Sequence, residues 1–173
     1  MRLLLAVISI LLLNSCSEMK PEDYKNTKPI IKIEEYFQGN VKAWGMLQER
    51  SGEVKRQFVA DMKGEFDGQN LILNETFIWN DGEKQERRWK IKKVGDNRYE
   101  GTASDVVGVA KGVSFGSAFK FEYKLLVPYK DKKIKIKFDD WIFKQDEKTA
   151  INKATLTKFG FKVGELTVFF VKD

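Results

Sequence analysis

The sequence has no histidine and a single cysteine, Cys16. Without histidine, Ser-His-Asp and Cys-His catalysis and histidine-based zinc sites are excluded. One cysteine leaves no partner within the chain for a disulfide and too few thiolates for a metal cluster. Carboxylate pairs, Ser/Lys dyads and oxygen-ligated metals stay open, but no motif indicates them. We therefore expect no metal and no cofactor.

Long apolar runs are also scarce, because only residues 3–13 form one. A transmembrane helix needs about 20 apolar residues, so this run is too short to span a bilayer. It follows Arg2, and a positive residue before a short apolar stretch is typical of a signal peptide. No later run is long and apolar enough to cross a membrane.

The apolar run ends in residues 13–16, which read Leu, Asn, Ser, Cys. This tetrapeptide resembles the lipobox of bacterial lipoproteins. The resemblance implies that residues 1–15 are a signal peptide and that Cys16 carries a diacylglycerol thioether and a further acyl chain such as palmitate. Several acyl chains on one residue give stable membrane anchoring. Ser17 stands where an aspartate would indicate inner-membrane retention, which favours the outer membrane, facing the periplasm.

The rest of the chain divides into two parts. Residues 16–29 are polar, and we interpret them as a lipidated N-terminus and flexible tether. Residues 30–173 are enough for a single domain with a hydrophobic core, opening with a short helix or lead-in strand at 30–37. The 31 basic and 25 acidic residues indicate a mixed, solvated surface. Attraction to anionic lipid headgroups is the alternative interpretation of the charge, whereas nucleic acid is not an expected partner.

From about residue 40 onward, polar and apolar residues alternate and turn signals recur about every ten residues. This pattern predicts an all-β fold: an antiparallel up-and-down meander of about nine or ten strands. Closure into a lipocalin-like (calycin-type) barrel would remove exposed strand edges. A membrane-spanning barrel is disfavoured, because one face of the strands is rich in Lys and Glu rather than apolar.

Turn positions predict which residues face inward. Hairpin loops at 50–52 and 80–82 place Trp44 opposite Phe58 and Glu75 opposite Arg87. The inward face then contains Trp44, Met46, Arg56, Phe58, Met62, Leu73, Glu75, Phe77, Trp79, Arg87, Trp89 and Ile91. Later strands add Phe119, Phe121, Tyr123 and Asp140, with a bulge at 139–140 as a way to switch the faces.

Charged residues on this inward face require an explanation, because burying an unpaired charge is costly. Arg56, Glu75, Arg87 and Asp140 either form a buried ion network that fixes the register, which we favour, or form the polar floor of a ligand site. In a ligand site the arginines would hold a carboxylate or phosphate headgroup, and the aromatic residues would contact an acyl or isoprenoid tail. Acid/base catalysis by Glu75 and Asp140 is a third interpretation.

The candidate ligand-binding residues combine these charges with neighbouring rings and an amide. They are Trp44, Arg56, Phe58, Glu75, Phe77, Arg87, Trp89, Tyr123, Asp140 and Asn152, and Asn152 is expected to hydrogen-bond Asp140. Glycines recur every fourth residue in 105–116. We favour a kinked or edge strand with close backbone approach there, and a flexible portal loop is the alternative.

Several short motifs identify a family resemblance. They are Trp44-Gly45, Arg50-Ser51-Gly52, residues 77–82, residues 87–89, residues 99–103, residues 105–110, Asp139-Asp140-Trp141, Ile151-Asn152 and residues 158–161. Together they resemble DUF3833, a family of uncharacterised proteobacterial lipoproteins, over about residues 34–172. The resemblance implies a Gram-negative envelope lipoprotein and is compatible with a lipocalin-like barrel, but it carries no established activity.

The expected function is to bind or carry an acyl-type lipid, fatty-acid-like or phospholipid-like, or another small apolar ligand. Two alternatives stay open: an enzyme acting on such a lipid through Glu75, Arg87 and Asp140, and a structural or interaction lipoprotein with a filled core. A binder needs a cavity, a structural protein needs the interior filled, and an enzyme needs a cavity with a carboxylate of perturbed pKa. The expected partner is the membrane, through the N-terminal lipid.

Overall fold

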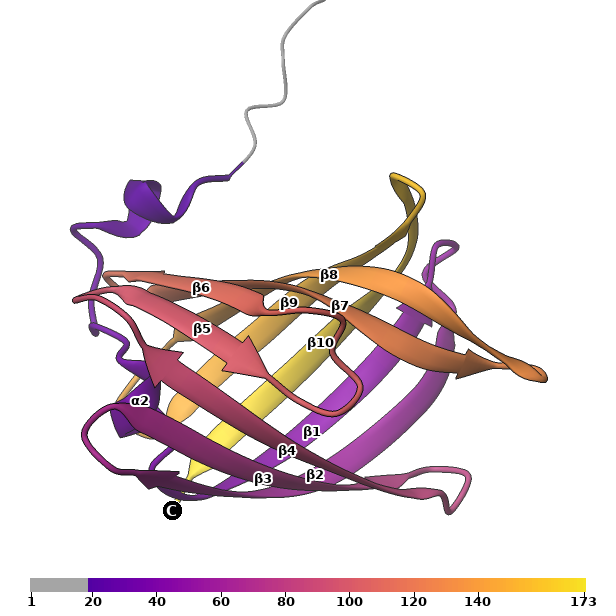
Figure 1. Cartoon of the computed structure of the whole chain (residues 1–173), viewed down its shortest axis with the longest axis horizontal. Coiled ribbons are helices and arrows are strands. Elements are labelled where there is room, and N and C mark those ends of the chain that lie inside the picture. The colour runs from indigo at the N-terminus through magenta and orange to yellow at the C-terminus, as the bar shows by residue number, and fades with distance from the viewer. Residues whose placement is uncertain (1–18) are drawn as a thin grey trace, which may run out of the picture.

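The computed structural model describes residues 19–173 and shows a β-barrel with a helical N-terminal segment beside it (Figure 1). The predicted signal peptide, residues 1–15, and the predicted lipidation of Cys16 lie outside the described residues. No helix in the described part of the chain is long and apolar enough to cross a bilayer.

Within residues 19–173, two short helices precede ten strands. In chain order the elements are η1 Pro21–Tyr24, α2 Ile33–Tyr36, β1 Gly39–Glu49, β2 Val54–Phe66, β3 Asn70–Trp79, β4 Lys84–Lys93, β5 Arg98–Thr102, β6 Ala110–Phe115, β7 Ala118–Tyr129, β8 Lys132–Lys144, β9 Thr149–Lys158 and β10 Phe161–Lys172. Each strand pairs with the next, and β1 pairs with β10 to close the barrel. The predicted all-β meander is confirmed.

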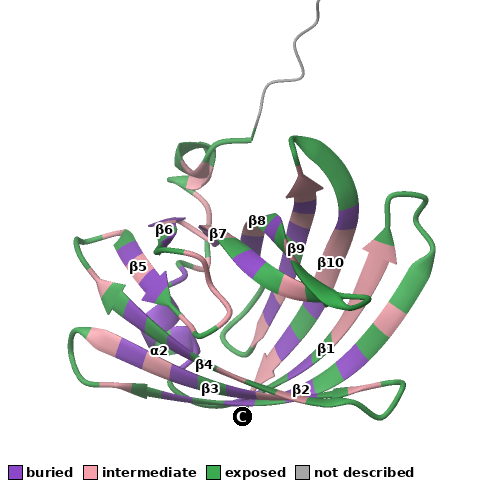
Figure 2. Ribbon diagram, turned by 45° about the vertical axis from the view of Figure 1, so that its right-hand side comes forward, coloured by how far each residue is buried: buried purple, intermediate pink, exposed green. Residues whose placement is uncertain are grey.

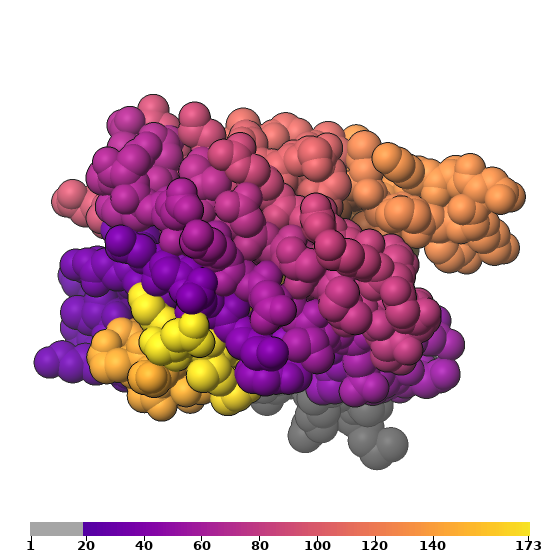
Figure 3. All heavy atoms as spheres, turned by 90° about the horizontal axis from the view of Figure 1, so that it is seen from below, coloured from indigo at the N-terminus to yellow at the C-terminus, as the bar shows by residue number. Residues whose placement is uncertain are grey.

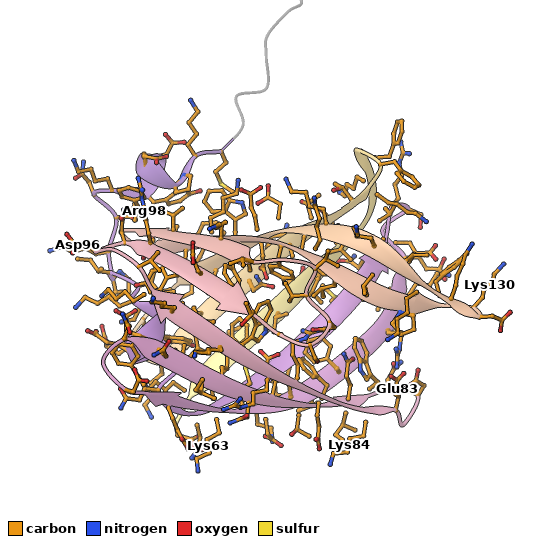
Figure 4. All side chains as sticks on the ribbon, in the orientation of Figure 1. Lys63, Glu83, Lys84, Asp96, Arg98 and Lys130 are labelled. Carbon is orange, nitrogen blue, oxygen red and sulfur yellow. The ribbon has the colours of Figure 1, made fainter. Side chains whose placement is uncertain are left out.

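Alternation of side chains explains why these segments form a barrel. Along β2 and β3 more buried and more exposed residues alternate (Figure 2), so that the inward face is mainly apolar and Glu75 is the buried charged residue of β3. Charged side chains at the loops and on the outer wall point away from the barrel, as Figure 4 shows for Lys63, Glu83, Lys84, Asp96, Arg98 and Lys130. The β7–β8 hairpin extends furthest from the barrel wall (Figures 1 and 3).

The β3–β4 register is as predicted, with Glu75 opposite Arg87. The β1–β2 register differs, because a bulge between Leu47 and Gln48 shifts the pairing by one residue, and Trp44 lies opposite Val59. Since side chains alternate with a period of two, that shift turns Trp44 and Met46 outward. Trp44 is 43% exposed, and the prediction that both residues face inward is wrong.

β8 pairs with β7 and β9 without a register shift, so the bulge predicted at 139–140 is absent. Asp140 faces the interior, while Trp141 and Phe143 face outward. Trp141 is nevertheless buried. The Tyr24 ring lies 5.9 Å from it and the Lys120 ammonium 5.4 Å. Trp141 is therefore buried because other side chains cover the outer surface of β8 at this point. The inward and outward faces of the strand do not change places.

The N-terminal segment packs against the barrel over residues 19–29, where the sequence predicted part of a flexible tether. Thr27 Oγ1 accepts a hydrogen bond from Ser117 N at 2.9 Å and lies 2.8 Å from its hydroxyl. Gly116 adopts φ +51°, and a Cβ there would lie 1.9 Å from the Tyr24 carbonyl oxygen. Close backbone contact thus attaches this segment to the β6–β7 turn.

α2 closes one end of the barrel and inserts a carboxylate into it. Ile33 and Phe37 are buried, and so is Glu34, which is only 4% exposed. Glu34 accepts hydrogen bonds from Lys93 Nζ at 2.6 Å and from Tyr99 Oη at 2.8 Å. Burial acts to raise the pKa of Glu34, but these bonds and the Lys93 charge lower it below its usual value. The ionised carboxylate therefore fixes the closing helix to β4 and β5.

Replacing Tyr99 by phenylalanine should lower the free energy of unfolding by about 1–2 kcal/mol at pH 7, since a hydrogen bond to a charged group is lost. The pKa of Glu34 is lowered, so its stabilising contribution is present above its unfolded pKa and is lost as pH falls through its folded pKa. The effect of Tyr99→Phe should shrink accordingly in acid. Urea denaturation at neutral and at acid pH measures the loss in free energy of unfolding and its pH dependence. Tyr129→Phe is the control, because Tyr129 is 52% exposed. If both variants lowered the free energy of unfolding equally, the hydrogen bond from Tyr99 to Glu34 would not stabilise the fold.

The barrel wall is less completely paired between β4 and β7 than elsewhere, because β5 and β6 are short. β5 pairs with β4 only at Lys90–Lys93, so the rest of β4 has no strand on that side. Residues 103–109, here called the cover segment, occupy this place (Figure 1). Val107 N donates to Lys124 O at 2.8 Å, and Leu126 N donates to Asp105 O at 2.9 Å.

The predicted glycine-rich stretch therefore divides into two structures. Its second half is strand β6, in which Gly112 allows close approach, since a Cβ there would lie 2.8 Å from the Phe119 ring. Its first half belongs to the cover segment, which pairs with β7 through the single bridge Val106–Leu125 and otherwise lies outside the strands. The predicted close approach is present at Gly112, but β6 pairs with both β5 and β7 and is not an edge strand.

Candidate ligand site inside the barrel

A cavity of about 100 Å³ lies inside the barrel, between the closing helix α2 and the cover segment side of the wall. Ile33 and Phe37 line it from the closed end, and strands β2, β3, β4, β7, β8, β9 and β10 all contribute side chains. Drug-sized ligands occupy pockets of about 300–1,000 Å³, and a dry apolar cavity of about 150 Å³ holds benzene. The cavity as it stands therefore fits a small molecule or the end of a larger one.

Aromatic rings form most of the wall. Phe58 and Phe77 meet edge to face at 5.2 Å between centroids. The Trp89 ring lies 5.3 Å from Phe121 and 5.4 Å from Tyr123. Such offset and edge-to-face contacts are favourable and hold the rings in place. The wall is consequently apolar and rigid.

Glu75 on β3 and Arg87 on β4 lie opposite each other and are two of the charged side chains that line the cavity. Arg87 donates two hydrogen bonds to Asp105 Oδ2, from Nε at 3.0 Å and from Nη2 at 2.8 Å. Its Nη1 lies 3.7 Å from Glu75 Oε2, beyond hydrogen-bond distance. Glu75 Oε2 is buried and has no hydrogen-bond partner among the described residues. Arg87 therefore holds the cover segment through Asp105 while Glu75 keeps an unused acceptor.

Asp140 is the second interior carboxylate, and its partners satisfy it. Tyr123 Oη donates to Asp140 Oδ2 at 2.8 Å. Asn152 Nδ2 donates to Asp140 Oδ1, as the sequence predicted, and to the Trp141 carbonyl oxygen at 3.1 Å. Three adjacent strands, β7, β8 and β9, thus supply one hydrogen-bonded cluster.

Burial changes the acidity of both carboxyl groups. Desolvation raises the pKa of Glu75 to about 7, with Asp105 and Asp140 raising it further while the Arg87 charge lowers it. Desolvation likewise raises the pKa of Asp140 to about 7 against the opposing hydrogen bond from Tyr123. Burial and the Asp140 charge raise the pKa of Tyr123 well above its usual value. Near neutral pH the interior therefore contains two carboxyl groups that exchange protons with solvent.

Eight of the ten predicted ligand-binding residues line this cavity. They are Phe58, Glu75, Phe77, Arg87, Trp89, Tyr123, Asp140 and Asn152. Trp44 is on the outer wall, where its ring lies 6.3 Å from that of Phe169. Arg56 is on the inward parity but at the end of β2, 4.0 Å above the Trp79 ring and 2.8 Å from both Asp81 and Glu83. Arg56 does not join the interior cluster, because loop carboxylates hold it at the barrel end.

Sequence reasoning missed four contributors, which are Asp105, Phe121, Ile33 and Phe37. Asp105 was recognised only as the start of a glycine-rich segment, and nothing local indicates that it reaches Arg87. Phe121 was placed on the inward face but not in the site, although its position beside Tyr123 in the alternation was a usable signal. Ile33 and Phe37 reach the cavity through α2, whose docking depends on tertiary contacts.

This arrangement does not provide the anion site that the sequence suggested. A carboxylate or phosphate headgroup needs free guanidinium donors. Arg56 is engaged outside the cavity, and Arg87 is engaged by Asp105, with Glu75 beside its remaining nitrogen. In residues 19–173 no group of three or more His, Cys, Asp or Glu side chains is placed to hold a metal ion.

Comparisons with known proteins support the fold. A family model described as "Protein of unknown function (DUF3833)" matches residues 10–172. No curated protein matches the chain. The structure of the S-type phycobiliprotein lyase CPES from Guillardia theta is similar with a TM-score of 0.59 at 10% identity, covering 90% of this chain and 98% of the lyase. A DUF3598 family protein of unknown function from Nostoc punctiforme has a TM-score of 0.62 at 11% identity, covering 84% of this chain and 51% of its own.

Proposed function

The chain belongs to the DUF3833 family, and on that premise we propose that it is an envelope lipoprotein whose barrel binds a small apolar ligand. The observation that carries the proposal is the closed barrel's interior cavity, with aromatic walls and a buried, unpartnered Glu75 oxygen. An apolar pocket with a few convergent polar groups of perturbed pKa is the usual form of a ligand site. The likeness to the phycobiliprotein lyase supports the barrel in which such a cavity forms.

The cellular setting is proposed from the sequence. Lipid attached to Cys16 anchors the chain, and Ser17 directs it to the outer membrane, with the barrel in the periplasm. In that setting acyl-type lipids are available ligands, and the apolar wall suits part of an acyl chain. The small volume limits the enclosed part to a few carbon atoms unless the wall moves.

Access to the cavity is proposed through the cover segment. It pairs with β7 only through the Val106–Leu125 bridge and the two backbone hydrogen bonds that form this bridge, whereas full strands form continuous ladders. The ion pair between Arg87 and Asp105 links it to β4. Displacing residues 103–109 would break only this bridge and the Arg87–Asp105 ion pair, and it would open the wall between β4 and β7 beside the cavity residues Trp89 and Tyr123.

The test is to purify the full-length protein from the bacterial envelope, record native mass spectra and extract bound molecules. A co-purified molecule in about one-to-one ratio is expected. Val168→Phe should abolish its retention, since Val168 is buried and lines the cavity. Val171→Phe is the matched control on the outward side of the same strand. A ligand-free mass for the wild-type chain, unchanged after incubation with fatty acids, phospholipids and small amines, would favour a structural lipoprotein instead.

A second candidate, an enzyme acting on the ligand, has one specific observation in its favour. Glu75 and Asp140 both have a pKa of about 7, which suits general acid and base roles near neutral pH. Under this alternative Glu75→Gln or Asp140→Asn would retain bound molecule but stop its conversion. Comparing the extracted molecules from wild type and these variants by mass spectrometry separates an enzyme from a carrier.

A further inference from the structure

The interior has more negative than positive groups. Four side chains with charge or a titratable proton face Glu75: Arg87 from β4, Asp105 from the cover segment, Tyr123 from β7 and Asp140 from β8. Arg87 is the only cation among them, and Asp105 already neutralises it through two hydrogen bonds. Glu75 therefore shares this one cation with Asp105, at 3.7 Å from Arg87 Nη1, and the three carboxyl groups face a single positive charge.

The two remaining carboxyl groups differ in what they offer a ligand. Asp140 receives hydrogen bonds on both oxygens, from Tyr123 and Asn152. Glu75 Oε2 receives none, although the residue is only 7% exposed and lines the cavity. A buried acceptor without a donor is destabilising, so a ligand that supplies a donor there should bind more tightly than one that does not.

The aromatic wall points to the same ligand chemistry. The faces of Trp, Tyr and Phe rings attract cations, and Arg87 already lies 5.6 Å from the centroid of Phe77. Trp89 and Tyr123 stand at the cavity close to Glu75 and Asp140. An anionic headgroup would instead meet two carboxyl groups in a low-dielectric interior, where like charges repel strongly.

We propose that the ligand of this cavity is an apolar amine, bound as its ammonium with an N–H group donating to Glu75 Oε2 and its carbon skeleton against the aromatic wall. The proposal rests on the proposed function and specifies the ligand class. The cavity volume of about 100 Å³ suits an ammonium with a short aliphatic or aromatic body. A longer chain would extend past the cover segment.

Binding of an ammonium should be linked to protons. The ionised form of Glu75 accepts the donor and attracts the charge, so binding lowers the pKa of Glu75 and releases a proton below about pH 7. Affinity should therefore rise as pH increases from about 5.5 to about 8. Asp105 and Arg87 stay ion-paired within the protein, whereas Asp140 titrates in the same range and is coupled to Glu75, so the difference between wild type and Glu75→Gln assigns the part due to Glu75.

Calorimetry with three probes of equal chain length tests the ligand class: hexylammonium, hexan-1-ol and hexanoate, titrated into the full-length protein in neutral detergent. At pH 8 hexylammonium should bind at least about tenfold more tightly than hexanoate, the magnitude of a hydrogen bond to a charged group. Glu75→Gln should reduce that preference severalfold. Glu86→Gln should preserve it, because Glu86 is exposed on the outer face of β4.

The outcomes separate the two proposals. Binding of hexan-1-ol with equal or tighter binding of hexanoate would overturn the amine inference and leave the apolar-ligand function intact. Failure of all three probes, together with an empty envelope-purified protein, would overturn both. A further measurement uses the wild-type protein alone, so it does not depend on the folding of Glu75→Gln. Calorimetry at pH 6 in two buffers of different ionisation enthalpy should show that hexylammonium binding releases protons.

Discussion

Replacing Arg87 by alanine should lower the free energy of unfolding by about 3–5 kcal/mol at pH 8, the range measured when one partner of a buried ion pair is removed. Arg87 is the counter-charge for both Asp105 and Glu75, and its loss leaves their carboxylates uncompensated. The same change removes the side chain that links the cover segment to β4. The variant should therefore also lose bound ligand.

The destabilisation caused by Arg87→Ala should be larger at pH 8 than near pH 5.5. Arg87 lowers the pKa of Glu75, so without it the pKa of Glu75 rises further and the carboxyl group protonates more readily. Near pH 5.5 the uncharged group needs no partner, and the destabilisation should be smaller than at pH 8. Chemical denaturation at both pH values measures the difference.

Arg88→Ala provides the matched control, because Arg88 is the next residue of β4 and is exposed on the outer face. It should change the free energy of unfolding by less than about 0.5 kcal/mol, as surface substitutions usually do. If Arg87→Ala were as mild as Arg88→Ala at both pH values, the interior ion network would have no structural role. A stable Arg87→Ala protein that nevertheless lost its ligand would point to binding alone.

Glu75→Gln should stabilise the protein at pH 8 and leave it almost unchanged at pH 4. Folding raises the pKa of Glu75 from 4.5 to about 7, so the folded state binds the proton more tightly. For an acid shifted upward, stability is unpenalised below the unfolded pKa and falls as pH rises towards the folded pKa. A pKa difference of that size corresponds to a change of roughly 3 kcal/mol in the free energy of unfolding between pH 4 and pH 8.

The measurement is the difference in free energy of unfolding between Glu75→Gln and wild type from pH 4 to pH 8.5. Taking the difference removes the contribution of Glu34, whose pKa is lowered and whose effect has the opposite sign. Asp140 interacts with Glu75, so the two groups titrate as a coupled pair and broaden the transition. A difference that does not vary with pH would show that Glu75 is not desolvated in the folded protein, and Glu86→Gln should show no such trend.

Local patterns were sufficient for the neighbour pairing on β3 and β4. A two-residue period assigns each side chain to a face, and the glycine turn at 80–82 fixes which residues oppose each other. For this reason the sequence placed Glu75 opposite Arg87 correctly. The same logic failed for Trp44, because the bulge shifts the pairing of β1 with β2 by one residue, which reverses the faces assigned to Trp44 and Met46 and leaves no mark in composition.

The sequence by itself determined the all-β class, the order of strands, the family and most of the cavity lining, because these follow from alternation, turns and short motifs. Only the tertiary structure decided that Asp105 reaches Arg87, that Tyr24 covers Trp141 and that Arg56 stays outside the cluster. These contacts join segments far apart in the chain, and their geometry depends on packing and barrel closure. The balance of buried charge, and with it the expected ligand chemistry, follows from those long-range contacts.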